Sequence, residues 1–189
     1  MTCLQDMTGT ATQFSNAAEQ ALEEVLNRVR PVVRIMVTGH LGDKSQVTFQ
    51  LSETDYAHNE ASDPFAHRLV EFLDALMRPY EPPAGLTERG FVRLLQLLAG
   101  FLAQRLEAAL RKRRFSQLGA LQLDKDIRCI AGHMSRKAGA PVREGFARLT
   151  QMAQLLNLDH PAHALDYWAP GSPLQVRLAA RRGFEIISV

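Results

Sequence analysis

Apolar residues recur at helical spacing along most of the chain, which predicts a series of amphipathic helices. The first row consists of Phe14, Ala18, Leu22, Val25, Val29, Val33 and Met36. Steps of three or four residues place such a row on one face of a helix. Pro31 falls inside the row, so we expect a kink or break near Arg30. Gly39 and Gly42 are expected to end this helix.

The segments on either side of this helix lack a helical period. Residues 1–12 are polar and irregular, so we expect a disordered N-terminus. Residues 44–51 alternate between apolar and polar side chains, which predicts a short extended segment but no sheet. Residues 52–62 are acidic, and we expect a loop there.

Two further helices are predicted in the middle of the chain. Asp63 followed by Pro64 is a helix start, with a capping carboxylate before a proline at the first helical position. Thr87 can cap the longest helix, which we expect to reach about Arg113. The apolar row of that helix consists of Phe91, Leu94, Leu95, Leu98, Phe101, Leu102, Leu106 and Ala109.

The last third of the chain predicts shorter helices. Gly119 breaks the pattern, and the next helix is expected to stop near Gly139. Pro141 opens another helix, and a short one is expected around 161–167. Six or seven helices with one apolar face each predict an all-α bundle. We divide the chain into a disordered N-terminus (1–12), a long-helix bundle (13–118) and a small C-terminal helical module (119–189).

Composition narrows the environment of the protein. A net charge of +2 gives no global field that would favour nucleic acid. Two distant cysteines, the lack of a signal peptide and the lack of a long apolar run favour a cytosolic protein without a transmembrane segment. The basic run from Arg111 to Arg114 has two interpretations. Its positive charges either interact favourably with the dipole at the C-terminus of the preceding helix or form a patch that binds anionic lipid or an acidic partner.

No residue pattern predicts catalysis or a metal site. Cys129 and His133 are four residues apart on one helical face, but a second pair of ligands at zinc spacing is missing. Asp124 and Asp126 fall near a helix start, where carboxylates are favoured by the helix dipole. We therefore expect no catalytic residue, no cofactor and no metal, and a small helical enzyme is the least favoured of the functional classes.

Three blocks of sequence carry a resemblance to a known family. They are FSQLGALQLDKDIR (Phe115–Arg128), FARLTQMAQLLNL (Phe146–Leu158) and LDYW (Leu165–Trp168), and FQLSETDYAHNEASDPF (Phe49–Phe65) precedes them. Their order and spacing resemble the C-terminal end of subunit four of the conserved oligomeric Golgi complex, from about Ser15 to Leu178. After Leu178 the chain departs from the family pattern, since it reads AARRGFEIISV where the family continues into a further helix.

The resemblance implies a rod-like tethering subunit without enzymatic activity. It implies a peripheral location on the cytosolic face of the Golgi membrane and a role in capturing retrograde vesicles. The implied partners are the other subunits of the complex and, through the full-length protein, membrane fusion factors such as SNAREs and their regulators.

The resemblance also singles out Arg148, which the family pairs with a glutamate on a terminal helix. In this chain Glu185 is the nearest substitute, with Asp166 and Glu144 as alternatives, and a solvated arginine is the competing interpretation. Tyr167 and Trp168 either pack the C-terminal module onto the bundle or anchor a partner.

A free-standing, truncated helical interaction module is the alternative function. The helix around 14–36 discriminates between the two hypotheses. A piece of a longer rod is expected to expose apolar residues on this helix, whereas a complete module is expected to cover them.

Overall fold

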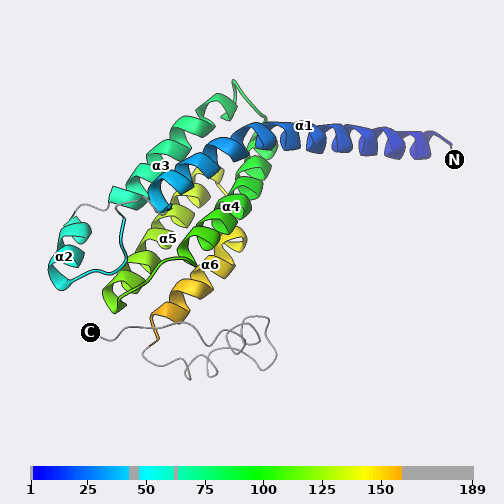
Figure 1. Cartoon of the computed structure of the whole chain (residues 1–189). Helices are drawn as coiled ribbons and strands as arrows, with labels where there is room; N and C mark the ends of the chain where they lie inside the picture. Colours follow the sequence, from blue (N-terminus) through cyan, green and yellow to red (C-terminus); the bar gives the residue numbers. More distant parts are fainter. Residues whose placement is uncertain (1, 43–46, 62–63, 159–189) are drawn as a thin grey trace, which may run out of the picture.

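The computed structural model describes residues 2–42, 47–61 and 64–158, and every regular element in these ranges is a helix (Figure 1). The prediction of an all-α fold is therefore confirmed. The elements are α1 (Thr2–Leu41), α2 (Glu53–Ala61), α3 (Pro64–Met77), the 3₁₀ helix η1 (Arg78–Tyr80), α4 (Glu88–Leu110), α5 (Gln117–Ala138) and α6 (Arg143–Leu156).

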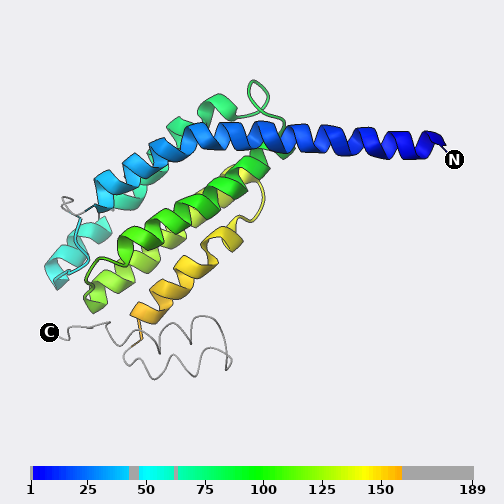
Figure 2. The ribbon, with the colours of Figure 1, turned by 45° about the vertical axis from the view of Figure 1, so that its right-hand side comes forward.

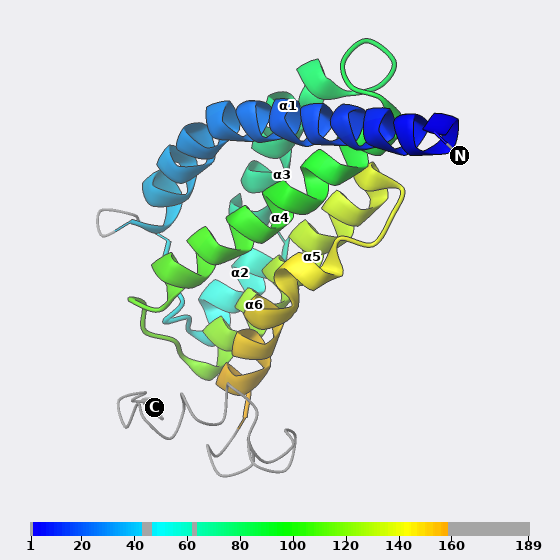
Figure 3. The same ribbon diagram turned by 90° about the vertical axis from the view of Figure 1, so that its right-hand side faces the viewer.

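The long helix α4 occupies the centre of the bundle. It packs against α1, α5 and α6, whereas α3 packs on α5. Helices α4, α5 and α6 lie side by side, and α1 crosses over them (Figures 2 and 3). The first half of α1 extends beyond the ends of the other helices (Figure 2).

The apolar row predicted on α4 forms the centre of the core. Its buried members are Phe91, Leu94, Leu95, Leu98, Leu102 and Leu106, together with Leu110. Phe101 and Ala109, which we also predicted, are only partly buried. Thr87 caps α4 as expected, since its hydroxyl oxygen accepts a hydrogen bond from the backbone N–H of Gly90 at 3.2 Å. Thr87 thus predicted the start of α4, and the apolar pattern predicted its buried face.

Helix α1 differs from the prediction at its start, and of the kink or break expected near Arg30 the break does not occur. It begins at Thr2 instead of near Phe14, so residues 2–12, which we expected to be disordered, are helical. A helix that already exists grows by one hydrogen bond per residue, so a proline-free polar segment can extend it without an apolar face. Pro31 does not break α1, although the ribbon bends in its second half (Figure 3). Val29 and Val33, buried on either side of Pro31, hold this part of the helix on the bundle.

The acidic segment that we expected to be a loop contains helix α2. Ser52 and Asp55 explain why it forms: the backbone N–H of Asp55 donates to the Ser52 hydroxyl, and the N–H of Ser52 donates to the Asp55 carboxylate, both at 3.2 Å. This reciprocal arrangement is a capping box, which satisfies two of the free donors at a helix start. The spacing of serine and aspartate was visible in the sequence, so the loop prediction was wrong for an avoidable reason.

The extended segment from Val47 to Leu51 was predicted correctly and fixes the start of α5. Phe49 forms an isolated parallel bridge with Phe115, and the backbone N–H of Ser116 donates to the Phe49 carbonyl at 2.9 Å. The Ser116 hydroxyl caps α5 through the N–H of Gly119 at 3.2 Å. Gly119 therefore lies inside the first turn of α5. We expected it to break the helical pattern, and that expectation was wrong.

The helices on both sides of residue 118 share one apolar core. Helix α5 ends at Ala138, close to the predicted end, and Gly139 caps it with a φ of +59°, the left-handed conformation that glycine favours. The short helix that we expected around 161–167 lies outside the described residues, as does the rest of the chain from 159. The division into a bundle and a C-terminal module therefore stays a prediction.

Candidate functional site: ionic contacts and an exposed apolar row

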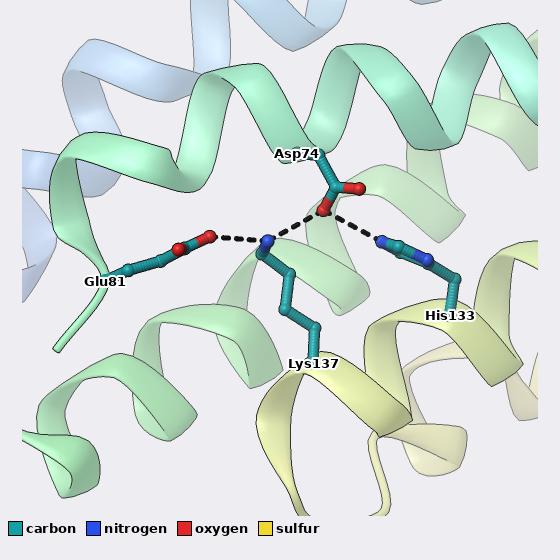
Figure 4. Close-up of polar contacts among 4 residues, drawn as sticks. All are labelled: Asp74, Glu81, His133 and Lys137. Atoms are coloured by element: carbon teal, nitrogen blue, oxygen red, sulfur yellow. Dashed lines mark hydrogen bonds and ion pairs between the residues drawn. The ribbon is translucent and has the colours of Figure 1, made fainter.

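A four-residue ionic cluster joins α3 and the turn after it to α5. Asp74 on α3 accepts hydrogen bonds from Lys137 Nζ at 2.7 Å and from His133 Nε2 at 3.0 Å, both through Oδ1. Lys137 Nζ also contacts Oε1 of Glu81, the residue that follows η1, at 2.5 Å. Figure 4 shows Lys137 between the two carboxylates. Because His133 and Lys137 are one helical turn apart, both reach the same carboxylate.

The surroundings of this cluster shift two pKa values. Burial alone would raise the pKa of Asp74, but the hydrogen bonds from Lys137 and His133 outweigh it and lower the pKa. Burial would likewise lower the pKa of Lys137, but the hydrogen bonds to Asp74 and Glu81 raise it. The cluster therefore favours the charged form of both groups.

The pKa shifts predict how the cluster contributes to stability at different pH. A lowered pKa for Asp74 means that its contribution is complete above about pH 4, the value of an unfolded aspartate, and is lost as the pH falls further. The raised pKa of Lys137 means that its contribution is complete below about pH 10 and is lost as the pH rises. Asp74 is 36% exposed, which weakens the effect by solvent screening.

We therefore expect Asp74→Asn to lower the free energy of unfolding by about 0.5–1 kcal/mol near neutral pH and by progressively less as the pH falls below about 4 toward the lowered pKa of Asp74. Urea unfolding of both proteins across this range measures the difference. Glu71→Gln, on the exposed side of α3, is the matched control and is expected to have little effect at any pH. A difference for Asp74→Asn that did not change with pH would show that the ionic contact is not its source.

A second ionic contact joins α6 to α4 and involves Arg148. Its Nε and Nη2 both lie 3.0 Å from Oε1 of Glu107, and Arg111 binds the same oxygen. Glu107 is only 13% exposed, whereas Arg148 is 50% exposed. A nearly buried carboxylate that receives two guanidinium groups ties the end of α4 to α6.

Glu107 was not among the partners that we named for Arg148. Glu185 and Asp166 lie outside the described residues, and the ionic partner that the structure gives Arg148 is Glu107 instead of Glu144. The sequence did contain a signal for Glu107 that we did not use. Helix α4 contains only one other acidic residue, Glu88, so few acids on this helix could pair with an arginine. Tyr167 and Trp168 lie outside the described residues, so their roles stay predictions.

Other charged side chains noted in the sequence also serve local contacts. In the basic run after α4, Arg113 donates to the carbonyl oxygen of Gly42 at 2.5 Å, which fixes the end of α1. Asp126, 2% exposed, accepts a hydrogen bond from Gln122 at 2.8 Å, and Asp124 pairs with Arg128. In the part of the chain that the structure describes, histidine, cysteine and acidic side chains form no group of three placed to hold a metal ion.

A row of apolar side chains on α1 faces solvent, and we name it the α1 row. It consists of Phe14, Ala18, Ala21, Val32 and Ile35. Phe14 is 74% exposed, Ile35 is 72% exposed and Val32 is 40% exposed. A different row, which includes Leu26 and Val33, packs on the bundle. Apolar side chains this exposed on one line of a helix are typical of a contact surface.

These features define a class of protein. The described residues form an amphipathic helical bundle in which ionic contacts fix neighbouring helices and one long helix presents apolar side chains, as in helical scaffold segments. None of the helices described here combines the length and apolarity that a membrane span requires.

The comparison with known sequences assigns the family. The chain belongs to the family of conserved oligomeric Golgi complex subunit 4, whose C-terminal profile matches residues 1–181. The relative named conserved oligomeric Golgi complex subunit 4 in Arabidopsis thaliana is 37% identical over 93% of the chain. Relatives of the same name in Bos taurus and Homo sapiens are 29% and 28% identical over 99% of the chain. The chain spans 23% of the length of each of these relatives.

Proposed function

We propose that this chain is a structural, non-enzymatic segment of a Golgi vesicle-tethering subunit. The observation that carries the proposal is the family match, which extends over residues 1–181. In this role the chain supports retrograde vesicle transport within the Golgi and the organisation of the Golgi itself. It acts at the cytosolic face of the Golgi membrane as a peripheral protein.

The mechanism is that of a rigid support. The contact of Asp74 with Lys137 and the contact of Glu107 with Arg148 hold α3, α4, α5 and α6 in fixed positions. A rigid segment keeps separate binding surfaces at set distances, so several weak contacts can act together on one vesicle. The partners are the other subunits of the complex and, through the full-length protein, SNAREs and their regulators.

The exposed α1 row favours this function over a free-standing interaction module. We expected a complete module to cover the apolar residues of its first helix and a piece of a longer rod to expose them. Phe14 and Ile35 are each more than 70% exposed. This exposure supports a chain that functions as part of a larger assembly.

Affinity purification tests the proposal. The tagged chain is expressed in cells of its own source, and the proteins that copurify are identified by mass spectrometry. We expect the other Golgi tethering subunits to be enriched at least about tenfold over a tagged control protein, because several weak contacts add in one assembly. Recovery of a soluble, folded chain without any tethering subunit would contradict an assembly role for this segment.

A further inference from the structure

Two arginines from different helices lie over the same aromatic ring where α1 meets α4. The guanidinium carbon of Arg30 on α1 is 5.7 Å from the centroid of the Phe101 ring, and that of Arg105 on α4 is 5.3 Å from it. A guanidinium group at this distance is attracted to the ring, because the aromatic face carries partial negative charge. Phe101 therefore gathers two like charges at a place where they repel each other.

The alignment of α1 and α4 brings a third arginine to the same level. The ion pair near the start of α4 and the contact of Arg30 with Phe101 further on show that the two helices run in the same direction (Figure 1). Arg34 is one turn beyond Arg30, and Arg105 is one turn beyond Phe101. Residues 34 and 105 therefore lie at the same level of the two helices. We name Arg30, Arg34 and Arg105 the arginine cluster.

The arginine cluster is poor in carboxylate partners. Residues 25–41 and residues 89–106 contain arginines but no aspartate or glutamate. Glu23, which is half exposed, contacts Arg30 at 2.5 Å. Glu107, the acid on α4 nearest to the cluster in sequence, is already bound by two other arginines. In the part of the chain that the structure describes, the carboxylate of Glu23 is thus the one that the three guanidinium groups share.

Several donors of the cluster have no acceptor among the described residues. Nε of Arg105 is buried without a hydrogen-bond partner, whereas the side chain as a whole is only partly buried. Both hydrogen bonds of Arg30 leave the same nitrogen, Nη1, one to Glu23 and one to Asn27 at 2.7 Å. Arg34 is exposed and forms no ion pair within these ranges. A buried donor without an acceptor costs free energy, which a ligand oxygen recovers when the end of the side chain turns toward it.

The arrangement of the cluster favours the carboxylates of a polypeptide as its ligands. Planar guanidinium groups bind carboxylate and phosphate oxygens through paired hydrogen bonds. The three arginines are spread over one turn of two neighbouring helices, and acids three or four residues apart on a partner helix have a similar separation. A membrane is flat and is contacted best by fully exposed cations, whereas Arg30 is 33% exposed and Arg105 is partly buried.

We infer that the arginine cluster binds an acidic helical segment of a partner protein, with glutamate or aspartate side chains one turn apart. The carboxylates pair with Arg34 and Arg105 and with the free nitrogens of Arg30, so the partner neutralises charges that repel one another in this chain. The inference goes beyond the proposed function, because it concerns the chemistry of one surface and holds for any partner that carries such a segment.

Fluorescence anisotropy with synthetic peptides tests the inference on the complete purified chain. The probe is a fluorescein-labelled, alanine-based helical peptide with glutamates in alternating steps of three and four residues. The control peptide has glutamine at the same positions. The test variants are Arg34→Gln and Arg105→Gln. Arg89→Gln is the matched control, because Arg89 is exposed in the first turn of α4 and its replacement changes the net charge by the same amount.

We expect the glutamate peptide to bind at least about tenfold more tightly than the glutamine peptide. Each test variant is expected to weaken the binding of the glutamate peptide by about tenfold, and Arg89→Gln by less than about twofold. An equal loss in all three variants would overturn the inference, since binding would then depend on net charge alone. Failure of the chain to bind the glutamate peptide would overturn it as well.

Arg34→Gln also covers the case in which Arg105→Gln disturbs the packing on Phe101. Arg34 is exposed, so its replacement is expected to leave the circular dichroism spectrum and the thermal unfolding of the chain unchanged. Loss of peptide binding in Arg105→Gln together with normal binding in Arg34→Gln would contradict the proposed cluster.

Sedimentation with vesicles of equal parts phosphatidylcholine and phosphatidylserine separates an acidic segment from a membrane. We expect little binding to these vesicles and no dependence on Arg34. Vesicle binding that is lost in Arg34→Gln, without binding of the glutamate peptide, would overturn the inference in favour of a lipid surface. These measurements need no other subunit of the complex, so their outcome is independent of the affinity purification that tests the proposed function.

Discussion

Replacing Leu98 by alanine is expected to lower the free energy of unfolding by about 3–4 kcal/mol. Leu98 is fully buried on α4, and α4 packs against α1, α5 and α6 at once. Truncation removes the transfer free energy of three carbon atoms and leaves a cavity that several helices must close together. Because these helices are also fixed by ionic contacts, the cavity can collapse only in part.

The adjacent residue provides the control for this prediction. Leu97→Ala makes the same chemical change one position earlier in α4, where the side chain is only partly buried. We expect it to cost about 1 kcal/mol, since less apolar area is lost and no closed cavity forms. Urea unfolding followed by circular dichroism gives both values. Equal losses would mean that α4 does not present Leu98 to the core as described.

Replacing Gly119 by alanine is expected to destabilise the protein by about 2–3 kcal/mol, although alanine is normally the better helix former by about 1 kcal/mol. A Cβ atom at this position would lie 1.6 Å from the carbonyl oxygen of Phe49. That oxygen cannot move freely, because it accepts the backbone N–H of Ser116, the N-cap of α5. The substitution must therefore displace the extended segment or the first turn of α5.

The same substitution elsewhere in α5 is expected to have the opposite sign. A Cβ atom at Gly132 would meet only the end of the Arg136 side chain at 3.5 Å, which is ordinary contact. Gly132→Ala is therefore expected to stabilise the protein by about 0.5–1 kcal/mol, the helix-propensity gain. Thermal unfolding of the two variants measures the difference. Destabilisation by both would refute close packing on Phe49 as the cause.

The amino-acid sequence by itself determined the family and most of the helices, although the start of α1 and helix α2 were not predicted. The row from Phe91 to Leu106 predicted the buried face of α4, because apolar side chains at helical spacing must share one core. Thr87 and Gly139 predicted helix ends, because capping depends on local chemistry. Blocks such as FARL and LDYW identified the family, since they can be read without any knowledge of contacts.

Only the tertiary structure decided which residues meet. Gly119 looked like a helix breaker, but its lack of a side chain is needed because the Phe49 carbonyl approaches from a segment far away in the sequence. Arg148 was predicted to pair with a nearby or C-terminal acid, whereas Glu107 on α4 holds it. The exposure of Phe14 and Ile35 was likewise undetermined, because periodicity shows that a helix has an apolar row but not whether another helix covers it.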